Sequence, residues 1–377
     1  MLHRWLSSSL SKHKPDLAQN ISADDESALP EASPKGEAIS GLRASKGSAG
    51  RMPASKDPSS SAEGANREAP GTAGVLPASK DPTAGEDHDC RIRIALKIEY
   101  DGTKFCGSQM QSGVRTVQED LEKALSAFFR SKDRIVLNPS GRTDSGVHAS
   151  GQVAHFDITP EQLTGAFKKH ESQGEVLVNL DEEVLRQICL SLNGILKEDI
   201  SVVAAQQVPL KFHSRFKAIR RTYVYRILNR PQRTALGYNA QYFVHSSLNI
   251  TNMQAAARAL LGTHDFSAFK SSNADDASPI CTVNRAELLN YGEGKLEFWI
   301  SADHFVYNMV RIIVGTLVDI GLGKREPSDL SYALTEKGRN LAGPTAPALG
   351  LCLHQVDYPA EFNLFQRGSQ EEPNQEI

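Results

Sequence analysis

Asp144 lies in the middle of a stretch of small residues, GRTDSGVHA, at positions 141–149. No other carboxylate occurs between Asp133 and Asp157, so any acid–base or nucleophilic chemistry in this stretch depends on Asp144. A positioned carboxylate can act as a nucleophile or as a general base. The glycines on both sides of it permit backbone angles that other residues resist, which suits a loop.

Two other interpretations of this stretch compete with a catalytic one. The first is a structural turn, because Thr-Asp-Ser-Gly is favourable turn chemistry. The second is an aspartic-protease loop, because Asp144-Ser145-Gly146 has the Asp-Ser/Thr-Gly form. That chemistry needs two carboxylates that share one proton. The chain has no second tripeptide of this form, so a homodimer would have to supply it.

The bulk composition is that of a soluble globular protein. The 377 residues allow two or three domains, and 40% of them are hydrophobic and 23% charged. The formal net charge of −3 argues neither for nor against a nucleic-acid partner. Between residues 91 and 359, 31 Lys and Arg stand against 28 Asp and Glu, so this part of the chain is slightly basic.

The cysteines and histidines do not indicate a disulfide framework or a metal site. The five cysteines are odd in number, widely scattered and without a Cys-x-x-Cys pair, which predicts reduced thiols in an intracellular compartment. The eleven histidines lack metal-ligand spacing, so we expect no metal. The most apolar window, 309–322, is short and contains two charges, so we also expect no membrane span.

The chain begins with a segment whose composition differs from the rest. Residues 1–14 contain Arg and Lys, four serines and no acid, with apolar residues at helical spacing, which is typical of a mitochondrial transit peptide. The alternative is a disordered start that lacks acids by chance. Residues 15–89 are rich in Ala, Ser, Gly and Pro and cannot bury enough apolar surface to fold. We therefore predict a transit peptide at 1–27 and a disordered linker at 28–89.

Folded sequence begins near residue 91. Apolar residues alternate over 91–100, which predicts a half-buried strand. A helix should begin after Thr116, with Glu119 completing a capping box. Strands are expected at 135–139 and 152–156, so that Asp144 lies on the loop between them.

Similar patterns continue to about residue 359. They predict helices at 181–192, 250–261 (capped by Thr251) and 305–321, and strands at 200–206, 283–289 and 295–301. The pattern before and after about residue 230 indicates two related α+β halves, 90–230 and 231–359. The remaining residues, 360–377, are polar and read as a loose tail.

A second informative stretch is strongly basic. Residues 211–233 contain eight cations and no acid, with aromatic residues interleaved. Basic side chains can neutralise phosphates, and aromatic rings can stack on unpaired bases, so this stretch predicts contact with RNA. The alternative is a strand whose polar face happens to be rich in arginine.

These motifs together resemble one family. GRTDSGVHA is similar to the signature of the tRNA pseudouridine synthase A family, GRTDAGVHA, with Ser145 where the family usually has Ala. The region 100–118 also resembles the family, although Ser108 stands where Trp is common. RTYVY at 221–225, GTHDFSAF at 262–269, FVYNMVRIIVG at 305–315 and the closing segment 350–359 follow in the family's order.

The resemblance implies a fold, a reaction and roles for individual residues. The fold would be a mixed, mainly antiparallel sheet flanked by helices in two pseudo-symmetric halves, the pseudouridine synthase fold. The reaction would isomerise uridine to pseudouridine in tRNA, with no cofactor and no metal. Asp144 would be the catalytic carboxylate, Arg311 its partner, and Tyr223 the residue that stacks on the target base and assists loss of the C5 proton. Substrate binding would fall to a set of arginines: Arg142, Arg220, Arg221 and Arg230.

Several expectations stay open at this point. The rival function is an RNA-binding or assembly protein that has the same fold without turnover. The resemblance is compatible with a homodimer or a monomer, and it leaves mRNA open as a further substrate. The address is mitochondrial if the first residues are a transit peptide, and otherwise cytoplasmic or nuclear.

Overall fold

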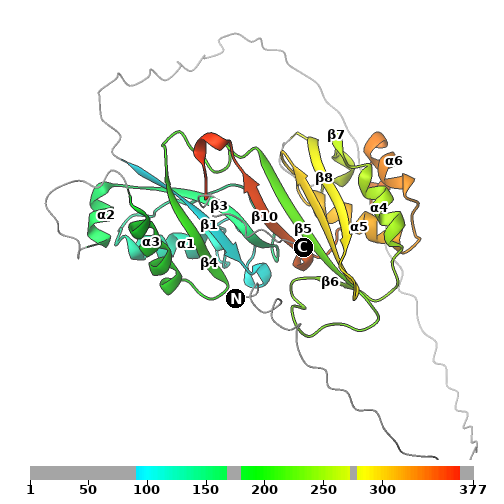
Figure 1. The fold of residues 1–377 in the computed structure, drawn as a ribbon, viewed down its shortest axis with the longest axis horizontal. Coiled ribbons are helices and arrows are strands. Elements are labelled where there is room, and N and C mark those ends of the chain that lie inside the picture. Colours follow the sequence, from blue (N-terminus) through cyan, green and yellow to red (C-terminus); the bar gives the residue numbers. More distant parts are fainter. Residues whose placement is uncertain (1–90, 168–179, 272–277, 366–377) are drawn as a thin grey trace, which may run out of the picture. The chain divides into compact units, whose positions relative to one another are not determined.

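A computed structural model describes residues 91–167, 180–271 and 278–365 (Figure 1). The chain divides into two units, Met1–Pro82 and Thr83–Ile377, and every described residue belongs to the second unit. The predicted transit peptide at 1–27, the linker at 28–89 and most of the tail at 360–377 lie outside the described residues.

The described residues form a ten-stranded sheet in the order β4-β1-β3-β10-β5-β9-β8-β7, with β2 beside β3 and β6 beside β5. The strands are β1 (Ile92–Tyr100), β2 (Asn138–Pro139), β3 (His148–Ile158), β4 (Ile200–Val208), β5 (Arg220–Asn229), β6 (Tyr242–Val244), β7 (Gly262–Asp265), β8 (Ile280–Asn290), β9 (Lys295–Ala302) and β10 (Leu351–Asp357). Neighbouring strands run antiparallel except β10 with β3 and β5 with β6, which are parallel. The predicted mixed, mainly antiparallel sheet is confirmed.

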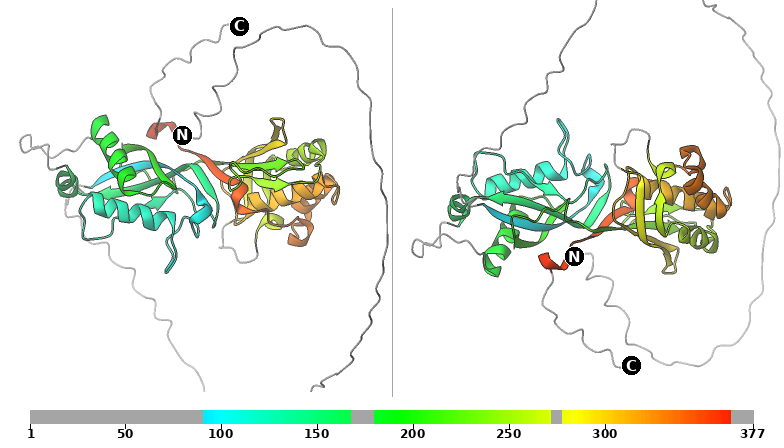
Figure 2. Two further views of the ribbon diagram at one scale, coloured as in Figure 1. Left: turned by 90° about the horizontal axis from the view of Figure 1, so that it is seen from below. Right: turned by 90° about the horizontal axis from the view of Figure 1, so that it is seen from above.

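Helices flank this sheet at both ends (Figure 1). They are α1 (Val117–Phe128), α2 (Pro160–Ala166), α3 (Glu182–Ile195), α4 (Ile250–Arg258), α5 (Met309–Gly321) and α6 (Ser328–Glu336). The first three lie with β1, β3 and β4, and the other three lie with β8 and β9, with β10 between the two groups in both views of Figure 2. Among the described residues, no helix has the length and apolar character needed to cross a membrane.

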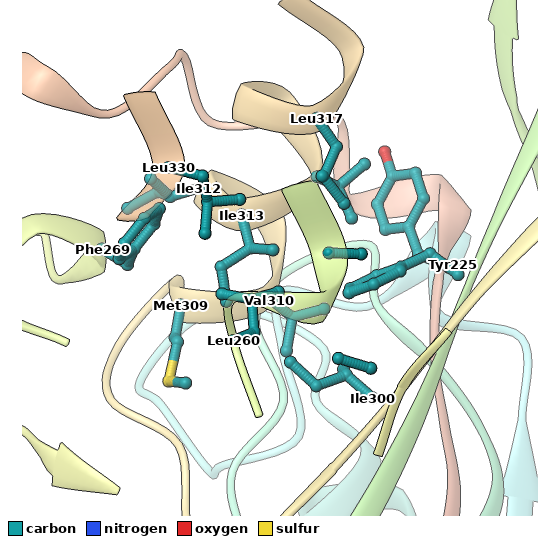
Figure 3. Close-up of a cluster of buried hydrophobic side chains, with 14 of the residues drawn as sticks. Tyr225, Leu260, Phe269, Ile300, Met309, Val310, Ile312, Ile313, Leu317 and Leu330 are labelled. Carbon is teal, nitrogen blue, oxygen red and sulfur yellow. The ribbon is translucent and has the colours of Figure 1, made fainter. Parts of the chain in front are cut away.

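Each group of helices covers its own hydrophobic core. One core contains the alternating apolar residues of β1, including Ile94, Leu96 and Ile98, with Leu121 and Leu125 of α1. The other is built mainly by α4, α5, β8 and β9, and Figure 3 shows the apolar side chains of α5 inside it. Tyr223 on β5 packs against both cores, so this strand joins the two halves.

Local interactions explain where elements differ from their predicted bounds. The predicted strand at 135–139 shrinks to β2, because the backbone N–H of Leu137 donates to the Glu122 carboxylate of α1. Helix α4 is capped by Asn249, whose side chain accepts from the N–H of Asn252, and not by Thr251. At α1, Thr116 caps as predicted, but the carboxylate of Glu119 pairs with Lys123 four residues on, so the reciprocal bond of a capping box is not made.

The start of α5 has the largest effect on the site. Asn308 has φ of 62°, a left-handed conformation that cannot continue into a right-handed helix. The helix therefore begins at Met309, and the residues Phe305–Tyr307 approach it as a loop, not as the first turn predicted for 305–321.

Candidate active site

The loop that carries Asp144 connects β2 to β3 and is held by the segment around Phe105. The N–H of Gly146 and the hydroxyl of Ser145 both donate to the Phe105 carbonyl oxygen, at 3.3 and 3.2 Å. The N–H of Val147 donates to the carbonyl oxygen of Asp144 at 3.1 Å, which closes a turn. The backbone thus forms the predicted turn, and the bond that closes it uses the carbonyl oxygen of Asp144 and not its side-chain carboxylate.

Ser108 fixes the other side of this loop. Its hydroxyl accepts from the N–H of Thr143 at 2.8 Å, and its own N–H donates to the Thr143 carbonyl oxygen at 3.0 Å. Ser108 is 3% exposed, so both bonds are shielded from water. A Cβ on Gly107 (φ 94°) would lie 3.1 Å from that same carbonyl oxygen, so a side chain there would be strained and crowded. Ser108, which stands where the family commonly has Trp, therefore helps to shape the loop that carries Asp144.

Asp144 faces Arg311 from the other half of the fold. The two side chains approach to 3.4 Å, between Nη1 of Arg311 and Oδ2 of Asp144, and both are partly buried. Arg311 lies in the first turn of α5, where its Nε donates to the carbonyl oxygen of Ala346 at 2.8 Å and its Nη1 donates to Oδ1 of Asn308 at 2.8 Å. The predicted pairing of Asp144 with Arg311 is present in the structure.

Burial and charge act on Asp144 in opposite directions. Burial raises the pKa of the Asp144 carboxyl, and the charge of Arg311 and its hydrogen bond lower it; the net pKa lies above the usual value for aspartate. Burial therefore has the larger effect, and Arg311 limits the rise.

Tyr223 completes the group. It lies on β5 between Leu353 of β10 and Ile300 of β9, and its ring meets the ring of Phe305 edge-on at 5.1 Å. Burial raises the pKa of Tyr223 well above its usual range, and the nearby charge of Asp144 adds to the rise. The phenol is thus neutral at physiological pH and presents a ring, not an anion, toward the site.

Several curated proteins are similar to this chain over most of their own length. The chain is 39% identical over 267 residues to tRNA pseudouridine synthase A 2 of Clostridium tetani, covering 70% of this chain and 98% of that protein. It is 41% identical over 270 residues to tRNA pseudouridine synthase A of Shouchella clausii (71% and 93%) and 38% identical over 267 residues to that of Bacillus subtilis (71% and 99%). The chain belongs to the tRNA pseudouridine synthase A family.

Two further comparisons are with a family model and with solved structures. A model of the family described as tRNA pseudouridine synthase matches residues 256–359, which include α5 and β10. A solved structure of a Cbf5-Nop10-Gar1 complex aligns with 69% of this chain and with 58% of the chain in that structure, at 8% sequence identity. Its TM-score of 0.25 is too low to support the assignment.

The family motif also contains His148, which ties the loop to distant segments. Its Nδ1 lies 3.0 Å from the backbone nitrogen of Gly102 and 3.1 Å from Oδ1 of Asp101. Nε2 lies 2.9 Å from the carbonyl oxygen of Asn239 and 3.1 Å from that of Leu349. His148 therefore joins the end of the loop that carries Asp144 to a loop after β5 and to the segment just before β10.

The four predicted substrate-binding arginines occupy different environments in this synthase. Arg142 is exposed, two residues before Asp144. Arg221 is partly buried and donates to four backbone carbonyl oxygens, those of Ala218, Asp303, Ser140 and Arg215. Its position on β5 puts it on the same face of the sheet as Tyr223, because side chains alternate along a strand.

The contacts of the other two arginines, Arg220 and Arg230, are with residues other than Asp144. Arg220 pairs with Asp357 of β10 at 2.6 Å and lies on the face of β5 opposite to Tyr223. Arg230 follows the end of β5, and its guanidinium donates to the carbonyl oxygens of Gln232 and Arg233. The structure thus pairs Asp144 with Arg311 and places Tyr223 within electrostatic range of Asp144. Arg142 is on the same loop as Asp144, and Arg221 donates to the carbonyl oxygen of Ser140 just before that loop.

One cluster in the described part of the chain has donor atoms close enough to hold a metal ion: Cys281, Asp303 and His304. Each donor already has a protein partner. Sγ of Cys281 lies 3.4 Å from Nε2 of His304, and Oδ1 of Asp303 accepts from the N–H groups of Thr282 and His304. Burial raises the pKa of the Cys281 thiol to about 12, which disfavours the thiolate that a metal needs. These contacts account for the cluster without an ion.

Sequence reasoning did not assign roles to Ser108 and Asn308. Ser108 looked only like a departure from the family, and its function depends on a contact with Thr143, 35 residues away. Asn308 carried a weak signal, since Asn is one of the few residues that tolerates a left-handed conformation just before an apolar helix.

Proposed function

We propose that this chain converts uridine to pseudouridine in tRNA, with Asp144 as the catalytic carboxylate. The observation that carries the proposal is the partly buried Asp144 carboxylate, 3.4 Å from Arg311 and near enough to Tyr223 for its charge to raise the pKa of that phenol. Two elements 167 residues apart in the chain thus bring a carboxylate and a guanidinium to one place.

The reaction sets clear demands on the site. The C1′–N1 glycosidic bond breaks, the uracil turns, a C1′–C5 bond forms, the hydrogen on C5 leaves as a proton and N1 gains one. Atoms balance without an oxidant or a second substrate, so the reaction is an isomerisation. A paired or stacked base hides these atoms, so the target uridine must first turn out of its stack.

Asp144 would split this rearrangement into easier steps. Attack on the ribose, attack on the base and removal of a ribose proton all fit a carboxylate in this position, and all need its ionised form. Arg311 supports that form by limiting the rise in its pKa. In the same account Tyr223 stacks on the target base. Its raised pKa keeps the phenol protonated, so Tyr223 could accept the C5 proton only after it had lost its own.

A short surface next to the catalytic loop would hold the RNA. Of the four aromatic residues interleaved in the basic stretch, Phe212 and Tyr225 are fully buried, Tyr223 is in the site, and Phe216 is 74% exposed. The guanidinium of Arg215 lies 5.8 Å from the centre of the Phe216 ring. Among the described residues no carboxylate lies within ion-pair distance of Arg215 or Lys217. We name residues 215–217 the 215–217 surface.

Arg221 connects this surface to the catalytic loop. One of its terminal nitrogens, Nη2, donates both to the carbonyl oxygen of Arg215 at 2.9 Å and to that of Ser140 at 3.1 Å, one residue before the loop. In this proposal a base stacks on Phe216, Arg215 and Lys217 contact phosphates, and Arg142 contacts the backbone at the target nucleotide. Arg221 then holds the backbone at Ser140 and Arg215 in place and does not itself contact the RNA. Direct contact of Arg220 and Arg230 with RNA stays a prediction.

The proposal also covers the localisation of the protein, its oligomeric state and its range of RNA substrates. The acid-free, basic start of the chain supports import into mitochondria. mRNA as a second substrate and a homodimer as the active form are compatible with the family. Sequencing RNA from cells with and without the protein, with a pseudouridine-selective chemical mark, tests the function. The expected result is loss of marked positions in tRNA, and unchanged marks would contradict the proposal.

A further inference from the structure

The side chain of Asn308 makes no capping bond to α5 and instead forms two hydrogen bonds with other side chains. Its Oδ1 accepts from Nη1 of Arg311 at 2.8 Å, and its Nδ2 donates to the hydroxyl of Ser271 at 3.0 Å. An arginine can only donate, so the oxygen of the amide must face Arg311 and the nitrogen must face Ser271. The amide therefore has one orientation, fixed from both sides.

The contacts of Asn308 decide where the guanidinium of Arg311 points. Nε is held by the carbonyl oxygen of Ala346 at 2.8 Å, and Nη1 is held by Asn308 at 2.8 Å, whereas Asp144 lies 3.4 Å from Nη1. The two shorter bonds go to neutral acceptors and hold the plane of the guanidinium. The charged contact with Asp144 is the longer one and follows from that orientation.

The backbone at position 308 restricts which residue can do this. A φ of 62° disfavours most side chains, while Asn and Gly tolerate it. Glycine would keep the backbone but lose both side-chain bonds. Aspartate would keep the shape and accept from Arg311, but it would bring a second negative charge to the arginine that serves Asp144.

We propose that Asn308 is a positioning residue for the isomerisation: it holds Arg311 so that Nη1 faces Asp144, and it anchors that arginine to Ser271. The proposal rests on the proposed roles of Asp144 and Arg311. Arg311 is the charged group that acts on the pKa of Asp144. Asp144 in turn acts on Tyr223, whose pKa also responds to Tyr100, Arg221 and Cys352. Among these, Arg311 is the one that Asn308 contacts.

The test uses the full chain with three variants, Asn308→Gly, Asn308→Asp and Ser271→Ala, in single-turnover assays on a tRNA substrate across a range of pH. Asn308→Gly should lower the rate constant by about tenfold or more, as expected for a displaced catalytic group, with unchanged RNA affinity. Asn308→Asp, nearly the same shape, should move the acid limb of the pH–rate profile to higher pH. Ser271→Ala should lower the rate less than Asn308→Gly.

Two results would overturn the positioning role: a wild-type rate constant in Asn308→Gly, or an acid limb that Asn308→Asp leaves in place. A purely structural role would lower thermal stability without moving the acid limb. Asp144→Asn in the same assay separates this proposal from the proposed function. An active Asp144→Asn variant would refute the proposed role of Asp144 itself. An inactive Asp144→Asn variant together with a fully active Asn308→Gly variant would refute only the positioning role of Asn308.

Discussion

Nη1 of Arg311 lies 3.4 Å from Oδ2 of Asp144, although 167 residues separate them in the chain. Strand β10 makes this possible, because it pairs with β3 on one side and with β5 on the other and so joins the two halves in one sheet. The pair thus depends on both halves being folded together. The ionisation of Asp144 is then a property of the whole fold, and it can be measured.

The first prediction concerns pH. In the proposed mechanism Asp144 must be ionised. Its pKa is raised, so activity should fall as the pH drops through that raised pKa. Arg311→Gln removes the charge that lowers this pKa, so the acid limb should move to higher pH and the maximal rate should fall. Single-turnover rates from about pH 3 to about pH 9 would show this, since that range spans the ordinary titration of carboxyl groups, near about 4, and of imidazole, near about 6.5.

The matched control for that measurement is Arg186→Gln. Arg186 is an exposed arginine on α3 that pairs with Glu183 three residues away. The substitution Arg186→Gln makes the same chemical change at a residue whose ion pair lies within α3, so it should leave the pH–rate profile unchanged. An acid limb that stays in place in Arg311→Gln would show that Arg311 does not act on the ionisation of Asp144.

The second prediction concerns the 215–217 surface. Arg215→Gln with Lys217→Gln should weaken RNA binding and make its logarithmic salt dependence shallower by about 1.4, from about 0.7 per single-strand phosphate contact. Phe216→Ala should weaken binding by about fivefold or more, as for loss of one stacked base, and Phe216→Trp should restore it. Equilibrium binding at several salt concentrations measures both effects.

Lys123→Gln serves as the control for these binding measurements, because Lys123 pairs with Glu119 on α1 and has no contact with this surface. A salt slope identical to wild type in the double variant would rule out phosphate contacts here. Weaker self-association with unchanged RNA binding in Phe216→Ala would assign the surface to a second copy of this chain.

The third prediction follows the hydrogen on C5. Tritium at C5 of the target uridine should appear in water once per modified base, because the new C1′–C5 bond displaces that hydrogen as a proton. RNA with 5-fluorouridine at the target should stall as a rearranged or enzyme-bound species, because fluorine cannot leave as a cation. A chelator should not change the rate. Tritium retained in a product that is chemically pseudouridine would contradict this mechanism.

The fourth prediction divides the chain by function. A protein that starts near Asp89 keeps every described residue and should modify RNA in vitro at the rate of the full chain. A reporter fused to residues 1–27 should reach mitochondria if the acid-free start is a transit peptide. A cytosolic or nuclear reporter would refute the address, and an inactive truncation would give residues 1–88 a role in catalysis.

Much of the site could be predicted from local sequence. Asp144, Tyr223 and Arg311 stand in short motifs whose order along the chain matches one family, and apolar periodicity located most strands and helices. Periodicity works where a single face is buried, as in β1, whose apolar side chains alternate with Arg93 and Lys97.

The rest depends on contacts between distant residues, which periodicity does not encode. Arg221 is a cation in a stretch without acids, and only the structure shows that it donates to four carbonyl oxygens. The short β2 follows from a bond between Leu137 and Glu122, and the role of Asn308 follows from its contacts with Arg311 and Ser271. These side chains act through partners that the sequence alone does not identify.

Asp144→Asn provides the fifth prediction, and its folding control comes first. The folded pKa of Asp144 is raised, so its contribution to stability is present below the unfolded pKa and is lost as pH rises through the folded pKa. At neutral pH the ionised carboxylate therefore costs stability. Asp144→Asn should unfold at the same temperature as wild type or at a higher one, and loss of activity then cannot be attributed to unfolding.

The most direct test of the catalytic role of Asp144 is the single-turnover rate of pseudouridine formation in tRNA by Asp144→Asn, read with a pseudouridine-selective chemical mark. The exposed Asp133→Asn is the matched control, with the same chemical change outside the site. We expect Asp133→Asn to match wild type and Asp144→Asn to lose orders of magnitude in rate while it keeps its RNA affinity. A rate above about a tenth of wild type, equivalent to a barrier change below about 1.4 kcal/mol, would contradict the assignment of Asp144 as the catalytic carboxylate.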